Sequence, residues 1–208
     1  DRPGAVGPRN EPEPIGERTA DIGKAVAALE AALKIIGGEE GDARRYGQRK
    51  TFDEREARSD AEHDRGSRIG AAESCTGGLI SSRLTDVPGS SRYVDRSVVT
   101  YSNEAKVAML GVPEASIAEH GAVSEPVALA MAEGIRRIAG VDVGIGVTGI
   151  AGPGGGTAEK PVGMVCVAAV APGGRRLRTG PFFGEREQIK FQASQAALDM
   201  VRRLLLVP

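Results

Sequence analysis

The spacing of apolar residues divides this chain into four stretches of different character. Residues 1–18 are rich in proline and almost free of apolar periodicity, which predicts a disordered leader. Residues 19–38 place apolar side chains at alternating steps of four and three and end in two glycines, which predicts one helix. Residues 39–68 hold nine acidic and eight basic residues, which predicts a solvated linker, so we expect the organised domain at 69–208.

Short apolar runs separated by glycine-rich turns fill residues 69–208, as in domains that mix helices with a central sheet. The runs rich in β-branched residues predict strands at 96–101, 141–147 and 164–170, with 175–183 as the second half of a hairpin. Helices are predicted at 79–87, 104–110 and 125–138, and at the C-terminus with Ile189, Ala193, Ala196, Met200 and Leu204 on one side. The fold class that follows is α/β, a three-layer α/β/α sandwich around a mixed sheet.

Composition and charge exclude several classes of partner. Hydrophobic residues make up 40% of the chain, and no apolar run approaches the roughly 18 residues that a membrane span needs, so no membrane contact is expected. The net charge of -1, with both signs interspersed, and an aromatic content of 3% argue against nucleic acid as a partner. The exposed apolar stripes of the predicted helices are compatible with a homodimer.

The two cysteines give no sign of a metal or disulfide framework. Cys75 and Cys166 lack metal-ligand spacing, and the two histidines do not cluster with them, so neither a metal nor another cofactor is expected. The chain opens with Asp1, and its first residues show no charged-then-apolar signal region. A reduced, cytoplasmic protein is the expectation.

Two glycine-rich turns, residues 73–78 and 148–157, are candidates for binding an anion. Glycine lets backbone amides approach a phosphate closely, and a following helix adds a favourable dipole. Neither turn matches the dinucleotide fingerprint or the P-loop. Taken alone, such glycine-rich loops are more often ordinary turns than anion sites.

Residues 89–106 combine serine hydroxyls, a phenol and a lysine around a predicted strand-to-helix junction. If Asn103 caps the helix, Lys106 is the third helical residue, where the helix dipole and burial both favour a neutral amine that can act as a base for serine. A solvated lysine beside turn serines is the alternative. A second candidate is Cys75 as the nucleophile with His120 as its partner. The favoured alternative is that Cys75 is a small buried thiol and His120 an ordinary loop histidine.

Six successive motifs resemble the CinA C-terminal domain, or PncC, family in their order and spacing. They are A-E-S-C-T-G-G (72–78), V-P-G-S-S (87–91), V-T-Y-S-N-E-A-K (99–106), G-A-V-S-E-P (121–126), V-T-G-I-A-G-P-G-G-G-T (147–157) and K-P-V-G (160–163). The resemblance implies a metal-free amidohydrolase that converts nicotinamide mononucleotide to nicotinic acid mononucleotide and ammonia in pyridine nucleotide recycling. A non-catalytic nucleotide-binding or competence-related interaction domain of the same fold is the alternative.

The resemblance also assigns roles to residues. It implies a serine-lysine pair assisted by a tyrosine, with Ser91 rather than Ser90 as the nucleophile, Lys106 as the base and Tyr101 beside them. The substrate-binding residues that it implies lie in the two glycine-rich turns and at one lysine: Glu73, Ser74, Thr76, Gly77, Gly78, Thr148, Gly149, Gly152, Pro153, Gly154 and Lys160.

One departure from the family pattern concerns the first strand. Family members run an apolar strand directly into A-E-S-C-T-G-G, whereas here the polar H-D-R-G-S-R-I-G precedes it. Either the charged segment is an insertion that shortens the strand, or residues 40–70 do not represent a native sequence. A poorly formed first strand is therefore the expectation.

Overall fold

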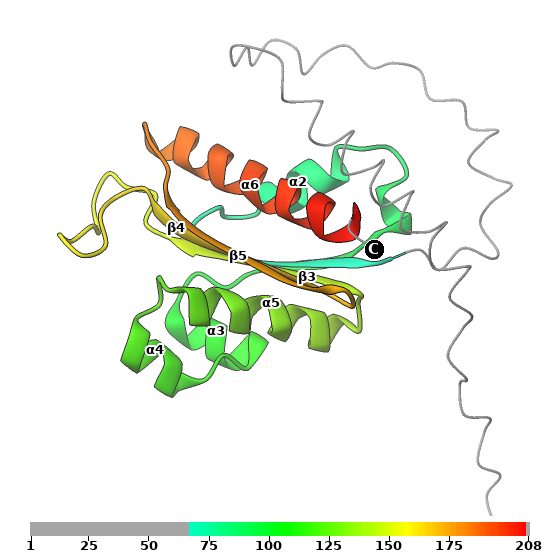
Figure 1. Cartoon of the computed structure of the whole chain (residues 1–208), viewed down its shortest axis with the longest axis horizontal. Helices are drawn as coiled ribbons and strands as arrows, with labels where there is room; N and C mark the ends of the chain where they lie inside the picture. The colour runs from blue at the N-terminus through cyan, green and yellow to red at the C-terminus, as the bar shows by residue number, and fades with distance from the viewer. Residues whose placement is uncertain (1–66, 207–208) are drawn as a thin grey trace, which may run out of the picture.

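The computed structural model describes residues 67–206 (Figure 1). In chain order the elements are β1 (Ile69–Glu73), α2 (Leu79–Thr85), the 3-10 turn η2 (Ser90–Arg92), β2 (Val94–Val99), α3 (Asn103–Leu110), α4 (Glu114–His120), α5 (Glu125–Ala139), β3 (Val143–Gly149), β4 (Met164–Ala171), β5 (Gly174–Pro181) and α6 (Arg186–Leu206). The predicted leader and helix, and the linker up to residue 66, lie outside the described residues.

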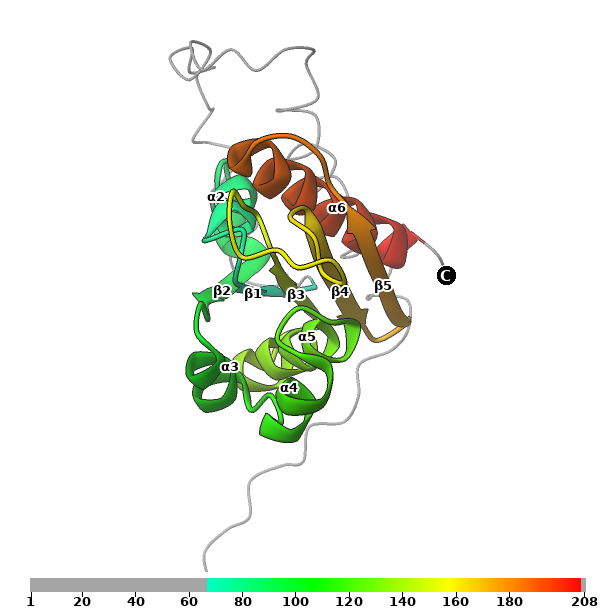
Figure 2. The same cartoon turned by 90° about the vertical axis from the view of Figure 1, so that its left-hand side faces the viewer.

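A five-stranded mixed sheet forms the middle of three layers. Its order is β2-β1-β3-β4-β5, with β1 parallel to both neighbours and the last two pairings antiparallel. Helices α2 and α6 cover one face, and α3, α4 and α5 lie on the other (Figures 1 and 2). The predicted three-layer sandwich is confirmed.

The alternation of side chains along β1 and β3 divides the core between the two faces. Ile69, Ala71 and Ile145 pack with the buried side of α6 in the larger apolar cluster. Ala72 points the other way, against Met131 of α5. In α6, the five residues predicted to share one side are all buried.

Glycine at alternate positions of β3 lets α5 lie directly on the strand. An ideal Cβ at Gly144 would lie 2.1 Å from the Ala132 carbonyl oxygen, and one at Gly146 would lie 2.1 Å from the Ala128 carbonyl oxygen. Any side chain there would force the helix away. The V-G-I-G-V run therefore fixes the depth at which α5 packs.

The first strand is short and fully buried. β1 holds five residues, all buried, and pairs on both sides, with β2 and with β3. The expectation that it would be poorly formed is wrong. Ile69 and the small residues after it can be buried on both faces of the strand, as a central strand between two helical layers requires.

Three local predictions are corrected. Ser102, not Asn103, caps α3: its hydroxyl accepts a hydrogen bond from the Ala105 amide at 3.1 Å, which makes Lys106 the fourth helical residue. Helix α4 was not predicted, because only one large apolar residue, Ile117, is half-buried in it. Strands β2 and β3 are offset by two residues from their predicted positions.

No helix within residues 67–206 is long and apolar enough to cross a membrane.

Candidate active site

The carboxyl ends of the three parallel strands meet at one edge of the sheet, where the site lies. The Thr100 amide, just after β2, donates to the Glu73 carbonyl at the end of β1 at 2.8 Å. β3 ends beside them at Gly149. In open α/β sheets this edge is where ligands are usually bound.

Ser74 and Lys106 are in contact at this edge. The Lys106 Nζ lies 3.3 Å from the Ser74 Oγ, and both residues are buried, with only 1% of Lys106 exposed. Helix α3 carries the lysine, and the turn after β1 carries the serine. A hydroxyl and an amine are thus within reach of proton transfer across 32 positions of sequence.

The amine of Lys106 is surrounded by carbonyl oxygens rather than by carboxylates. It donates to the backbone oxygens of Thr100 at 3.0 Å, Tyr101 at 3.3 Å and Ser102 at 3.4 Å. Burial lowers the pKa of Lys106, and the nearby Cys75 and Glu104 only partly oppose this shift. The site therefore favours the neutral amine, which can accept a proton from Ser74 while still donating to two carbonyls.

A pocket of about 190 Å³ opens over this pair. Its lining is formed by Ser74, Cys75, Tyr101, Asn103, Lys106, Ala122, Val123, Thr148, Gly149, Ala151 and Arg186. Figure 2 looks at this end of the molecule, where the β3–β4 loop runs across the front. The pocket thus brings together both predicted glycine-rich turns and the predicted lysine and tyrosine.

Ser91 lies at the opposite end of β2 from Lys106. It belongs to η2, before β2 begins, and is exposed, while the lysine contacts the Thr100 carbonyl after β2 ends. The six-residue strand between them spans about 20 Å at ~3.3 Å per residue. Within one copy of the chain, neither Ser91 nor Ser90 can therefore contact Lys106, and the predicted contact is wrong. These residues are close in sequence, but the whole length of β2 separates them in space.

Tyr101 lines the pocket but is 64% exposed. Its hydroxyl accepts a hydrogen bond from Arg186 at 3.3 Å, and its backbone oxygen accepts one from Lys106. Arg186 also donates to the Gly152 carbonyl at 2.7 Å, so it links the β3–β4 loop to the tyrosine. Sequence analysis missed Arg186, because it follows Ser74 by more than a hundred residues and belongs to none of the six motifs.

Cys75 is buried and unsuited to act as a nucleophile. Desolvation raises the pKa of its thiol to about 12, which disfavours the reactive thiolate at neutral pH. His120 does not line the pocket that holds Cys75. We expect Cys75→Ala to fold normally and to keep the activity of the parent protein within a few-fold. Loss of turnover in a folded Cys75→Ala protein would move the nucleophile to this thiol.

Glu73 has a structural role that the predicted binding role overlooked. Its carboxylate accepts hydrogen bonds from the amides of Gly78 at 3.0 Å, Ile80 at 3.1 Å and Ser81 at 2.9 Å. The side chain is fully buried and closes the turn onto the start of α2. Glu73 therefore shapes the turn that carries Ser74, and it is not one of the residues that line the pocket.

The rest of that turn combines buried and open positions. Gly77 and Gly78 adopt positive φ angles of 62° and 95°, which glycine accepts without strain. Thr76 is fully buried, and its hydroxyl has no hydrogen-bond partner among residues 67–206. In the same described part, the amides of Cys75 and Thr76 donate no hydrogen bond to another residue. Those two amides are available to an oxyanion next to Ser74.

The second predicted turn is held from several sides. Thr148 donates from its hydroxyl to the Ala122 carbonyl at 2.9 Å, and Gly149 leaves no room for a side chain against Val165. Gly152 has a φ of 77° and is joined to Pro153 by a cis peptide bond. Pro153 and Gly154 are exposed. Thr148 and Gly149 line the pocket, while Gly152, Pro153 and Gly154 lie outside its lining.

Lys160 supports the loop from outside the pocket. Its ammonium donates to the backbone oxygens of His120 at 2.6 Å and Val123 at 2.8 Å. These bonds tie the β3–β4 loop to the segment between α4 and α5. These two bonds weaken the predicted substrate-binding role of Lys160, because two of its donors are already used.

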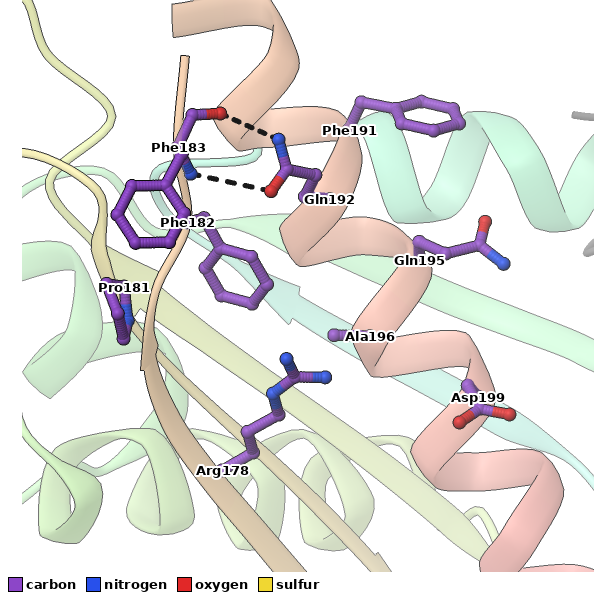
Figure 3. Close-up of a pocket in the computed structure, with 9 residues that line it drawn as sticks. All are labelled: Arg178, Pro181, Phe182, Phe183, Phe191, Gln192, Gln195, Ala196 and Asp199. Carbon is purple, nitrogen blue, oxygen red and sulfur yellow. Dashed lines mark hydrogen bonds between the residues drawn. The ribbon is translucent and has the colours of Figure 1, made fainter. Parts of the chain in front are cut away.

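A larger pocket, of about 560 Å³, lies between β5 and α6 (Figure 3). Phe182, Phe183 and Phe191 give it an apolar wall, and Gln192 hydrogen-bonds the Phe183 backbone. Its lining contains no serine, cysteine, lysine or histidine. Despite its size, it lacks the nucleophile and base that the smaller pocket holds. No cluster of three metal-ligating side chains occurs anywhere in the described part of the chain.

Comparison with known proteins agrees with this architecture. The model of the CinA C-terminal domain matches residues 53–205. The chain belongs to the CinA C-terminal domain family. A CinA-like protein of Syntrophobacter fumaroxidans is 59% identical over 142 residues, which cover 68% of this chain and 34% of that protein. The chain thus spans about a third of the length of this relative.

Solved structures of family members share the fold. The competence/damage inducible protein CihA from Agrobacterium tumefaciens has a TM-score of 0.67 and 35% identity, covering 88% of this chain and 95% of its own. The competence damage-inducible protein A from Klebsiella pneumoniae has a TM-score of 0.66 and 30% identity, covering 88% of this chain and 95% of its own. These names describe competence and damage, and they specify no reaction.

Proposed function

We propose that this CinA-family domain is an amidohydrolase that deamidates nicotinamide mononucleotide, with Ser74 as nucleophile and Lys106 as general base. The observation that carries the proposal is the 3.3 Å contact between the Ser74 hydroxyl and a buried lysine with a lowered pKa. A buried lysine without a carboxylate partner costs stability, which a purely structural position would have no reason to accept. The substrate comes from the family resemblance.

The first half of the reaction acylates Ser74. The neutral Lys106 amine takes the hydroxyl proton as the Ser74 Oγ attacks the carboxamide carbon, and the carbonyl oxygen becomes an oxyanion. When this intermediate collapses, the carbon–nitrogen bond breaks and the leaving nitrogen takes the proton from Lys106. Ammonia departs, an ester remains on Ser74, and Lys106 is neutral again.

The second half hydrolyses the ester with the same base. Lys106 takes a proton from water as the water oxygen attacks the ester carbon, and collapse returns that proton to the Ser74 oxygen. The product is a carboxylic acid, which ionises at neutral pH. One amine therefore serves both half-reactions without net change.

The surrounding groups stabilise and orient the reacting amide. The candidates for binding the oxyanion are the amides of Cys75 and Thr76, which donate to no other residue within residues 67–206, and one such donor typically contributes about 3 to 4 kcal/mol to the transition state. Arg186 and Tyr101 also line the pocket, where the arginine donates a hydrogen bond to the tyrosine hydroxyl. Tyr101 thereby positions the substrate, and its exposed hydroxyl is not needed to relay a proton that Lys106 reaches directly.

Ammonia release tests the proposed function. The purified protein is incubated with nicotinamide mononucleotide, and ammonia is measured with a coupled enzyme. Lys106→Met, which is close in length and has no amine, is the matched control. Release by the parent protein and none by Lys106→Met supports an amidohydrolase. No release from the parent contradicts the proposal and favours a domain that binds nucleotide without turnover. Equal release above background from both proteins contradicts Lys106 as the base.

The pH dependence follows from the lysine. Because the base must be neutral, kcat/KM should rise with pH as Lys106 loses its proton. Burial lowers the Lys106 pKa, so the midpoint of this rise should fall below the ordinary value of 10.5. A pH–rate profile from about pH 6 to pH 10 checks this. A profile that falls across this range would contradict a lysine base.

A further inference from the structure

A second cation follows Arg186 along α6 and lies beside the turn that carries Ser74. Lys190 is half-buried, and its Nζ lies 3.7 Å from the point where a Cβ on Gly77 would sit. Within residues 67–206 its ammonium has no hydrogen-bond or ion-pair partner. Four residues along a helix rise about 6 Å, so Lys190 and Arg186 lie on the same side of α6.

The pocket over Ser74 is smaller than a nucleotide. Pockets that enclose a drug-sized ligand have volumes of about 300 Å³ or more, whereas this one holds about 190 Å³. With the carboxamide against Ser74, the rest of the substrate must extend beyond the lining residues. Gly77 is exposed and three positions beyond Ser74, so the turn leads outward toward Lys190.

The other cations near the pocket are already engaged. Two donors of Lys160 are bound to backbone carbonyls, and Arg186 is bound to the Gly152 carbonyl and the Tyr101 hydroxyl. Lys106 is buried against Ser74. Lys190 differs from them because, among residues 67–206, none of its three donors is used by another residue.

We infer that Lys190 binds the phosphate of the substrate and thereby selects a nucleotide over the corresponding nucleoside amide. This inference rests on the proposed function for the identity of the reacting amide. A phosphate at this position would receive charge-assisted hydrogen bonds from the ammonium across the side-chain-free backbone of Gly77. The phosphate lies far from the broken bond, so its contribution should appear in binding rather than in chemistry.

The test compares two substrates that differ only in the phosphate. For Lys190→Ala we expect KM for nicotinamide mononucleotide to rise about 10- to 100-fold with kcat nearly unchanged, the size of one hydrogen bond to a charged group. For nicotinamide riboside, which lacks the phosphate, kcat/KM should not change. Lys190→Arg should keep most of the preference, and Arg175→Ala, an exposed cation on β5, is the control that should change neither.

Equal loss on both substrates, or no loss on either, would overturn the inference. Calorimetric titration of the same proteins with both compounds separates it from the proposed function. If the parent protein binds the nucleotide more tightly than the riboside, and Lys190→Ala removes that preference, the phosphate site stands even where no ammonia is released. If the preference survives in Lys190→Ala, the assignment fails whether or not the enzyme is active.

Discussion

Replacement of Ser74 by alanine should lower turnover of nicotinamide mononucleotide by on the order of 10⁴-fold or more, because no other hydroxyl within residues 67–206 contacts the base. Ser74 is the hydroxyl that lies 3.3 Å from the Lys106 Nζ. The hydroxyl removed is small, and within residues 67–206 its one hydrogen bond is the contact with Lys106. Substrate should therefore still bind, with a dissociation constant close to that of the parent protein.

Ser91→Ala is the matched control for this result. It removes the same group from an exposed turn at the other end of β2. We expect its kcat and KM to match those of the parent protein. Steady-state ammonia release from the two variants decides between them, and full activity in Ser74→Ala with loss in Ser91→Ala would contradict the site described above.

Gly146→Ala should destabilise the fold by about 3 kcal/mol or more, although it adds a single methyl group. The new Cβ would lie 2.1 Å from the Ala128 carbonyl oxygen and 2.6 Å from the Ala132 nitrogen, and both atoms are backbone of α5. The helix must move away from β3, which opens the apolar contacts that both elements share. Urea denaturation followed by circular dichroism measures the loss.

Gly173→Ala serves as the comparison, because a Cβ there would meet nothing within 4 Å. It lies in the turn between β4 and β5, where we expect a change in unfolding free energy within about 0.5 kcal/mol. Similar stability of the two variants would mean that α5 does not pack on β3 as closely as described.

Periodicity predicted most of the fold because helices and strands repeat their apolar positions differently. The stripe from Ile189 to Leu204 and the run from Met164 to Val170 appear as α6 and β4. Helix α4 was not predicted. Its one large apolar residue, Ile117, is half-buried, and a single such residue makes no apolar stripe. The role of Gly144 and Gly146 was not predicted either. They allow β3 to approach α5 closely, and the sequence around the two glycines does not show which element packs against them.

The site was predicted in part for the same reason. Lys106 and Tyr101 were found, because one motif holds both beside the helix start. The family resemblance assigned the nucleophile to Ser91, and Ser74 was predicted only to bind the substrate, although Ser74 lies in the glycine-rich turn 73–78. Parallel strands bring their carboxyl ends together, and that rule points to Ser74. Arg186 and Lys190 carry no local signal, since they meet the site only through the packing of α6.

Identification of the residue that becomes acylated tests the central claim most directly. The reaction with nicotinamide mononucleotide is quenched with acid, digested with trypsin and analysed by mass spectrometry. Cleavage after arginine places Ser74 and Cys75 in the peptide 69–83, and Ser90 and Ser91 in the peptide 84–92. We predict the acyl group on peptide 69–83, with fragmentation locating it at Ser74 and no label in the Ser74→Ala protein. An acyl group on peptide 84–92, or on Cys75, would contradict the Ser74–Lys106 centre.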